Sequence, residues 1–202
     1  MSAEIILFDL GNVVVDWRPI LLYEKLFDDP AEAQRFCSDV CTLAWHTEHD
    51  RGVPMDENAK PLIAKFPEYE RHIRAWKTGW LDMFAGYVPG TPKLIATLEE
   101  RRIPLYGLSN IPDEKAGETF DAFPIIKVLR DVVVSGAEKV VKPDPKIYAI
   151  ALERMGHPDP ASVLFIDDSR PNIDAAKALG FQTHHFQGAK CLEADLSKRG
   201  LI

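Results

Sequence analysis

Polar side chains follow three apolar stretches of the sequence, in each case at the point where the stretch ends. They are the carboxylate of Asp9, the neighbours Ser109 and Asn110, and the adjacent carboxylates of Asp167 and Asp168. A short apolar run predicts a buried parallel strand, and the carboxyl ends of parallel strands meet at the sheet edge where open α/β folds bind ligands. We therefore expect these side chains to form one site.

Lys142 adds a positive charge to this set. It precedes Pro143, which biases its backbone toward an extended or turn conformation. Together these groups suit phosphoryl transfer, because a carboxylate can act as a nucleophile, lysine and neutral donors can stabilise phosphoryl oxygens, and paired acids can bind a hard metal ion. Each residue alone also fits a structural role, since aspartate and serine often cap turns and a single lysine is often a solvated charge.

The order of these segments resembles the motifs of the haloacid dehalogenase superfamily of hydrolases, over nearly the whole chain. Asp9 stands where that family has its nucleophile, and Ser109 matches its second motif. Lys142, in Lys-Pro-Asp-Pro-Lys-Ile-Tyr, matches the third motif, and Asp167-Asp168 match the fourth. The likeness is strongest to bacterial sugar-phosphatase-like members with an Asp-Leu-Gly-Asn first motif, which include enzymes acting on glucose 1-phosphate.

The resemblance implies a bound metal ion, and Mg²⁺ fits the hard carboxylate ligands. The expected ligands are Asp9, the backbone carbonyl of Gly11, Asp168 directly, and Asp167 either directly or through water. Asn172 follows Asp167 in the next turn of chain. It is expected either to brace this loop or simply to begin a helix.

Gly11 departs from the family pattern. Most phosphatases that the chain resembles carry a second aspartate two residues after the nucleophile, which protonates the leaving oxygen and then activates water; here the position is glycine. Such a general acid–base group is typically worth about 10²–10⁴ in rate. The candidate replacements in the sequence are Asp16, His46, Glu48 and His49.

The hydrophobic pattern places these motifs in an α/β fold, with a Rossmann-like parallel sheet and a helical cap inserted after the first strand. Strands are expected at Ile5–Asp9, at the run ending in Ser109, at Val132–Ser135, Val163–Ile166 and Gln182–Phe186. Helices are expected at Thr91–Arg102, Asp113–Phe123, Pro145–Met155 and Pro171–Leu179.

Apolar residues at helical spacing fill the region between the first strand and the rest. The expected helices there are Ile20–Phe27, Pro30–Trp45, Met55–Lys65 and Pro67–Phe84. We therefore expect a hydrolase core made of residues 1–16 and 88–202, and a cap made of residues 17–87. Trp76 and Trp80 are interpreted as core residues of this cap rather than as a platform for a sugar.

The composition is that of an ordinary globular protein. The chain has 202 residues, 46% of them hydrophobic and 27% charged, with a net charge of −7. This charge disfavours nonspecific nucleic-acid binding, which needs a basic surface. We expect no membrane span and no leader, and we interpret Cys37, Cys41 and Cys191 as reduced core thiols. A cytoplasmic monomer or homodimer is expected.

The sequence thus predicts a Mg²⁺-dependent phosphatase of a small phosphorylated metabolite, such as a sugar phosphate, acting through an aspartyl-phosphate. The expected catalytic residues are Asp9, Ser109 and Lys142, and the expected substrate contacts are Ser109, Asn110, Lys142 and His46. For His46 the alternative is a solvated helix end. Two other functions stay open: a non-catalytic phosphometabolite-binding or scaffold protein, and a 2-haloacid dehalogenase that displaces halide without metal.

Overall fold

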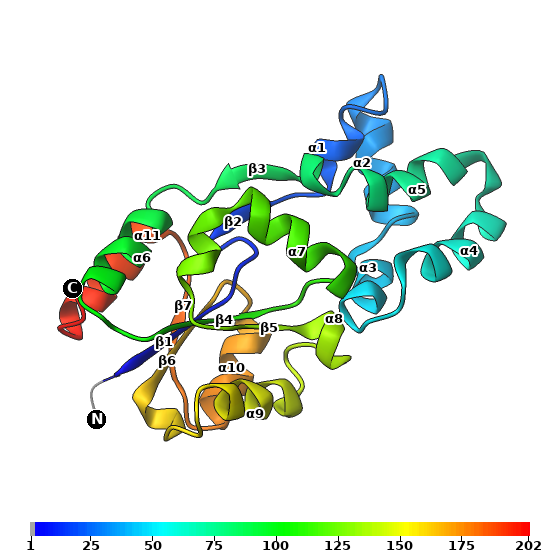
Figure 1. The fold of residues 1–202 in the computed structure, drawn as a ribbon. Helices are drawn as coiled ribbons and strands as arrows, with labels where there is room; N and C mark the ends of the chain where they lie inside the picture. The colour runs from blue at the N-terminus through cyan, green and yellow to red at the C-terminus, as the bar shows by residue number, and fades with distance from the viewer. Residues whose placement is uncertain (1–2) are drawn as a thin grey trace.

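A five-stranded parallel sheet lies at the centre of the computed structural model, which describes residues 3–202 (Figure 1). Its strands are β1 (Ile5–Phe8), β4 (Leu105–Ser109), β5 (Val132–Val134), β6 (Val163–Asp167) and β7 (Gln182–His185). Their order across the sheet is β5-β4-β1-β6-β7, so β1 pairs with β4 on one side and with β6 on the other. The predicted α/β fold with a parallel sheet is confirmed.

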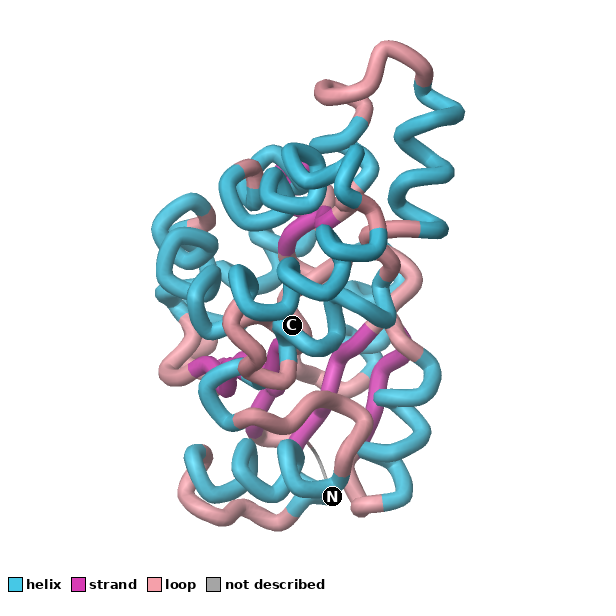
Figure 2. Tube along the Cα trace, turned by 90° about the vertical axis from the view of Figure 1, so that its right-hand side faces the viewer, coloured by secondary structure: helices cyan, strands magenta, loops and turns pink. Residues whose placement is uncertain are grey.

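Helices cover both faces of this sheet, because alternate side chains of each strand point to opposite sides. Ile6 and Phe8 of β1 pack in one hydrophobic cluster with α6 and α11, and Leu7 packs in another with α9 and α10. The helices are α6 (Thr91–Glu100), α7 (Asp113–Ala122), α8 (Ser135–Glu138), α9 (Pro145–Arg154), α10 (Arg170–Ala178) and α11 (Ala189–Lys198). Figure 2 shows the strands between these layers.

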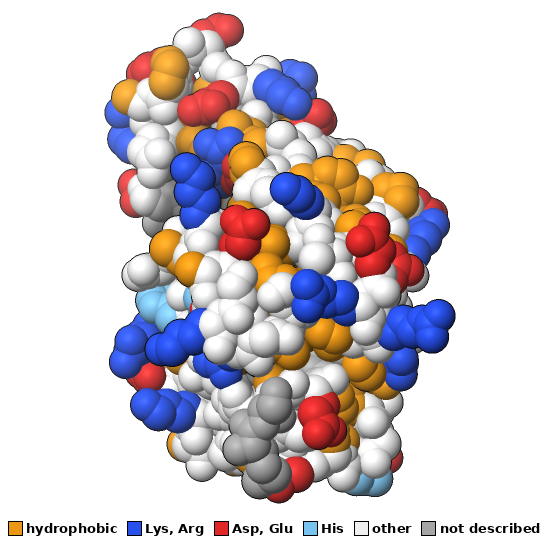
Figure 3. All heavy atoms as spheres, turned by 90° about the vertical axis from the view of Figure 1, so that its left-hand side faces the viewer, with side chains coloured by type: hydrophobic (Ala, Val, Ile, Leu, Met, Phe, Trp, Pro, Cys, Tyr) orange, Lys and Arg blue, Asp and Glu red, His pale blue; other side chains and the backbone are white. Residues whose placement is uncertain are grey.

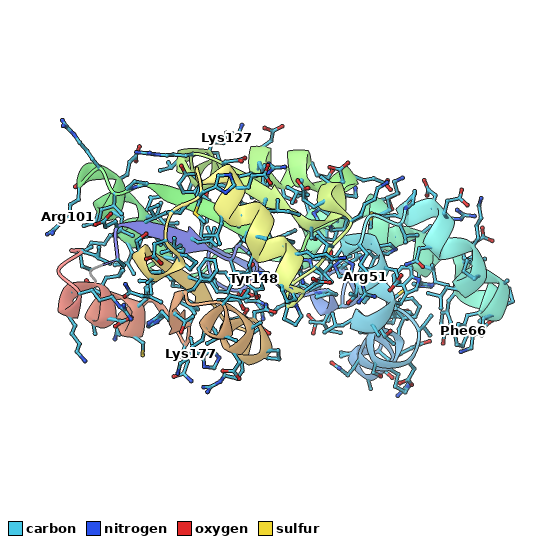
Figure 4. All side chains as sticks on the ribbon, turned by 90° about the horizontal axis from the view of Figure 1, so that it is seen from below. Arg51, Phe66, Arg101, Lys127, Tyr148 and Lys177 are labelled. Carbon is cyan, nitrogen blue, oxygen red and sulfur yellow. The ribbon has the colours of Figure 1, made fainter. Side chains whose placement is uncertain are left out.

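A helical insertion, residues 20–83, separates β1 from the other strands of the sheet. It contains α1 (Ile20–Tyr23), α2 (Pro30–Asp39), α3 (Leu43–Asp50), α4 (Met55–Lys65), α5 (Glu70–Thr78) and the 3-10 turns Pro67–Tyr69 and Trp80–Met83. Its own buried cluster includes Tyr23, Phe36, Trp76 and Trp80, so the two tryptophans belong to the core as expected. Phe66 lies at the end of the insertion remote from the sheet (Figure 4).

Two of the helices expected in this region are interrupted. The predicted helix over Pro30–Trp45 breaks after Asp39, and α3 begins anew after Thr42, whose side-chain oxygen accepts a hydrogen bond from the backbone N–H of Trp45 at 3.1 Å. This is a typical helix N-cap. The predicted helix over Pro67–Phe84 is likewise divided into α5 and two 3-10 turns, and it ends before Phe84.

A second, two-stranded sheet joins the insertion to the parallel sheet and was not predicted. It consists of β2 (Val15–Trp17) and β3 (Phe84–Tyr87), which pair antiparallel. Strands of three or four residues offer too few positions to show an alternating pattern in the sequence. Because the two strands pair, the chain enters and leaves the helical insertion at the same place, beside the carboxyl end of β1.

The C-terminal helix α11 was also not predicted, although Leu192 and Leu196 are buried at helical spacing. Cys37, Cys41 and Cys191 carry free thiols, but Cys191 is exposed rather than in the core, because it lies on the outer side of α11 next to buried Leu192. On the face shown in Figure 3, basic side chains are interspersed with acidic and apolar ones. Within residues 3–202, no helix is both long and apolar enough to cross a membrane.

Candidate active site

The carboxyl ends of three neighbouring strands bring the predicted residues together. Asp9 directly follows β1, Ser109 is the last residue of β4, and Asp167 is the last residue of β6. These strands are adjacent, with β1 in the middle, so their ends lie side by side. All three side chains are buried. The site is therefore built at the sheet edge where parallel α/β folds present their ligand-binding groups.

Asp9 is held in place by a neighbouring N–H group and by an ammonium group. Its Oδ1 accepts a hydrogen bond from the backbone N–H of Leu10 at 2.7 Å and lies 2.8 Å from Nζ of Lys142. Burial raises the pKa of Asp9 to about 8; Lys142 opposes this rise, whereas Asp167 and Asp168 add to it. Additional positive charge at the site would lower this pKa and favour the carboxylate form that a nucleophile needs.

Lys142 forms ion pairs with the carboxylates at the ends of β1 and β6. Its Nζ donates hydrogen bonds to Oδ2 of Asp167 at 2.7 Å and to the backbone carbonyl of Leu108 at 2.9 Å, in addition to its contact with Asp9. Burial alone would lower the pKa of this ammonium, but Asp167 and Asp9 outweigh that effect and raise the pKa. Lys142 therefore stays charged near neutral pH, although its side chain is only 1% exposed.

Asn110 fixes the backbone that carries this lysine. Its Oδ1 accepts a hydrogen bond from the Lys142 N–H at 2.8 Å, and its Nδ2 donates one to the Lys142 carbonyl at 3.1 Å. Asn110 was predicted to contact substrate. The observed pair of bonds engages both polar atoms of its amide group with the backbone of Lys142, so Asn110 braces this lysine. Its contact with substrate stays a prediction.

Asp167 is surrounded by hydrogen-bond donors. Nδ2 of Asn172 lies 3.0 Å from both of its carboxylate oxygens, the Ser169 N–H donates to Oδ1 at 2.7 Å, and Lys142 binds Oδ2. The backbone carbonyl of Asn172 accepts a hydrogen bond from the hydroxyl of Tyr148 at 3.0 Å. Tyr148 belongs to α9, the helix that lies below the sheet in Figure 1. Asn172 therefore braces the loop after β6, one of the two roles expected for it.

The carboxylates form a cluster with the composition of a hard-metal site. One oxygen each of Asp9, Asp167 and Asp168 lies within 4.8 Å of the others. Burial and the neighbouring Asp167 raise the pKa of the partly exposed Asp168. Within residues 3–202, three carboxylates lie around the ammonium group of Lys142, so the cluster has an excess of negative charge. Oxygen ligands with this charge fit a divalent cation such as Mg²⁺.

Two adjoining cavities lie at this edge of the sheet. The carboxylate-side cavity, of about 450 Å³, is lined by Asp9, Lys142 and Asp168 among others. The insertion-side cavity, of about 200 Å³, lies between the sheet edge and the helical insertion, and Ser109 lines it. The residues that line both cavities are Gly11, Trp17, Leu43 and Asn110. A ligand with a phosphoryl group in the first cavity can extend past Gly11 into the second.

Gly11 leaves open space at this junction. A Cβ atom built on it meets no atom within 4 Å, and its backbone does not adopt the left-handed conformation. An aspartate at this position would therefore be tolerated by the backbone.

His46 lines the insertion-side cavity, and its contact with substrate stays a prediction. Its Nδ1 accepts a hydrogen bond from the indole N–H of Trp76 at 3.2 Å. Burial lowers the pKa of His46 to about 3, with His49 contributing, so the imidazole is neutral near neutral pH. His49 lies on the side of α3 that faces α4, outside both cavities.

The other proposed replacements for the missing acid also lie outside both cavities. Asp16 forms an ion pair with Arg18 at 2.9 Å, and Glu48 forms one with Arg51 at 2.6 Å on the exposed surface of α3. The carboxylate that does line the insertion-side cavity is Asp50, which was not among the candidate replacements. Its spacing of four residues from His46 on one helix was the available signal.

The sequence is similar to a family model and to known phosphatases. The model of the haloacid dehalogenase-like hydrolases matches residues 3–180. The phosphorylated carbohydrates phosphatase of Thermotoga maritima is 25% identical over 182 residues, which are 89% of this chain and 82% of the relative. The phosphoglycolate phosphatase of Escherichia coli K12 is 28% identical over 131 residues, which are 65% of this chain but 49% of the relative.

Solved structures share the fold. A haloacid dehalogenase family enzyme of Bacteroides thetaiotaomicron superposes with a TM-score of 0.70 and 24% identity, over 93% of this chain and 95% of that one. A second structure of that enzyme, in complex with magnesium and inorganic phosphate, gives a TM-score of 0.69. The match of the family model to most of the sequence shows that the chain belongs to the haloacid dehalogenase-like hydrolase family.

Proposed function

We propose that this hydrolase is a Mg²⁺-dependent phosphomonoesterase that transfers the phosphoryl group of a small metabolite to Asp9. The observation that carries the proposal is the buried cluster at the sheet edge, in which Asp9 and Asp167 share the Lys142 ammonium and Asp168 lies alongside. A nucleophilic carboxylate, a fixed cation and acidic ligands for a metal are the groups that phosphoryl transfer requires.

Each residue has a defined task in this proposal. The Asp9 carboxylate attacks phosphorus while the bond from phosphorus to the ester oxygen breaks. Lys142 and the Ser109 hydroxyl hold the phosphoryl oxygens, and water then attacks the aspartyl-phosphate to release inorganic phosphate. Asp9, Asp168 and the Gly11 carbonyl would hold Mg²⁺, which would offset the charge of the phosphoryl group. Asp167, whose carboxylate oxygens already accept hydrogen bonds from Lys142, Ser169 and Asn172, orients Lys142 and would contact the metal through water.

The proposed substrate is a small phosphorylated metabolite, with sugar phosphates as the first class to test. Residues 17–87 act as a cap that closes over the leaving group, since α3 of this segment contributes His46, Thr47 and Asp50 to the insertion-side cavity. The relatives named above act on phosphorylated carbohydrates and on phosphoglycolate. We also propose a cytoplasmic location, which the three free cysteines support, because thiols persist in reducing compartments.

A panel of phosphate monoesters tests this function. The purified protein is expected to release inorganic phosphate from at least one sugar phosphate or other small phosphometabolite in the presence of Mg²⁺, and to lose this activity when the metal is chelated. If no ester of the panel releases phosphate although the protein binds Mg²⁺, a phosphometabolite-binding or scaffold protein would be favoured. Halide release from a 2-haloacid without metal would instead identify a dehalogenase.

A further inference from the structure

The helical insertion brings its own carboxyl group to the place where Gly11 leaves a general acid missing. We infer that Asp50 is the general acid–base of the phosphatase reaction and serves the leaving-group oxygen from the cap side. This inference rests on the proposed function. It replaces the four candidates from the sequence with a residue that faces the same cavity as Gly11 and Ser109.

The packing of α3 fixes the position of Asp50. Asp50 is the last residue of α3, and Gly52 follows two residues later with a φ of +86°. A Cβ atom at Gly52 would lie 2.5 Å from the backbone carbonyl of Gly136 in α8, so only glycine permits this approach. The close contact seats the end of α3 against the rim of the parallel sheet, and thereby directs Asp50 to the insertion-side cavity.

The carboxyl group of Asp50 is buried but incompletely satisfied. The residue is 6% exposed, and no group within residues 3–202 donates a hydrogen bond to its Oδ1. Nε2 of His46 lies 3.4 Å away, outside hydrogen-bond geometry. Because an unpaired polar atom in the interior is costly, a carboxyl group kept in this state points to a ligand that completes its bonding.

The neighbours of Asp50 favour its protonated form. Burial raises the pKa of Asp50 to about 8, while the Lys142 ammonium opposes the rise. His46 adds no full charge, because its imidazole is neutral and its Nδ1 already accepts the Trp76 indole N–H. The imidazole proton is therefore on Nε2, which faces Oδ1 of Asp50. This leaves Oδ2 of Asp50 to carry the acid proton.

Asp50 can then supply the proton that the leaving group needs and regain one from the attacking water. As the Asp9–phosphorus bond forms and the ester bond breaks, Asp50 gives its proton to the departing oxygen, and the product leaves as a neutral alcohol. The resulting Asp50 carboxylate takes a proton from water as the water oxygen attacks phosphorus and the bond to Asp9 breaks. Asp50 is protonated again when phosphate leaves. Neutral His46 cannot supply this acid, since its pKa lies near 3.

Asp50→Asn tests the inference, because the amide keeps the shape and the neutral charge but has no acidic proton. We expect turnover of an alkyl phosphate, whose leaving group needs protonation, to fall by about 10²–10⁴-fold. For 4-nitrophenyl phosphate, whose leaving group departs as a stable anion, the rate of 4-nitrophenol release in the first turnover, before water attacks the aspartyl-phosphate, should change little. The matched control is Asp16→Asn, which removes a carboxylate from β2 outside both cavities and should leave both activities unchanged.

A second substitution separates chemistry from packing. Gly11→Asp placed in the Asp50→Asn protein restores a carboxyl group at the family's usual position, where a side chain meets open space. It should raise alkyl-phosphate turnover by on the order of tenfold or more above that of Asp50→Asn alone. An equal loss of the first-turnover rate on both ester classes, or no loss of turnover on either, would overturn the role of Asp50 while leaving the phosphatase function intact. A wild type inactive on every ester would overturn both.

Discussion

Asp9→Asn should reduce the Mg²⁺-supported release of phosphate by on the order of 10⁴–10⁶-fold, the scale on which removal of a covalent nucleophile acts. The asparagine oxygen can still accept the Leu10 N–H, so the loop after β1 keeps its hydrogen bond. The amide is not a nucleophile, however, and it removes the charge opposite Lys142. Steady-state kinetics of the purified variant measure this effect, with a saturating ester and fixed Mg²⁺.

The control for this prediction is again Asp16→Asn, which makes the same chemical change a few residues away on β2. The folded state of Asp9→Asn is expected to be at least as stable as the wild type without metal, because burial already penalises the Asp9 carboxylate. A variant that retains turnover within about tenfold of the wild type would contradict covalent catalysis, because the loss of a covalent nucleophile should reduce turnover far more than this. It would point instead to direct attack by water.

Asp168→Ala is expected to abolish the binding of Mg²⁺ and, with it, turnover. At a Mg²⁺ concentration of about 100 times Kd, binding should raise the free energy of unfolding of the wild type by about 2.7 kcal/mol. The variant should show no such rise. Without metal, it should be no less stable than the wild type, because Asp168 contributes to the repulsion that raises the pKa of Asp9. Isothermal titration and thermal unfolding with and without Mg²⁺ measure both effects.

A suitable control lies on the next helix. Asp174 of α10 is exposed and pairs with Arg170, so Asp174→Ala removes an acidic residue near the site without touching the cluster. Its Mg²⁺ affinity should equal that of the wild type. Unchanged Mg²⁺ affinity in Asp168→Ala would show that the metal site has been assigned to the wrong residues.

The sequence was sufficient to predict the sheet and the convergence of polar residues at its edge. Ile5–Phe8 and Val163–Ile166 are continuous apolar runs, as buried parallel strands require, and the polar residue that ends each run marks the edge. Because side chains at neighbouring strand ends must approach one another, no knowledge of the loops was needed to group Asp9, Ser109 and Asp167.

The sequence was insufficient wherever a role depends on how separate segments pack. Asn110 is a polar residue at a strand end, but its hydrogen bonds to Lys142 depend on a loop far along the chain. Asp50 is one of several ionisable residues on α3, and its place on the cavity follows from the packing of this helix, which includes the close approach of Gly52 to Gly136. The short strands β2 and β3 were missed because their pairing, rather than their pattern, defines them.

The most direct test of the proposed function is to trap the phosphorylated enzyme. Wild-type protein is mixed with an active phosphate ester and Mg²⁺, quenched in acid within the first turnover, digested and examined by mass spectrometry. We predict one phosphoryl group on the peptide that contains Asp9, its loss under alkaline conditions as for an acyl-phosphate, and its absence in Asp9→Asn. Turnover of the ester without any phosphoryl group on that peptide, or with the group on a different residue, would contradict the mechanism.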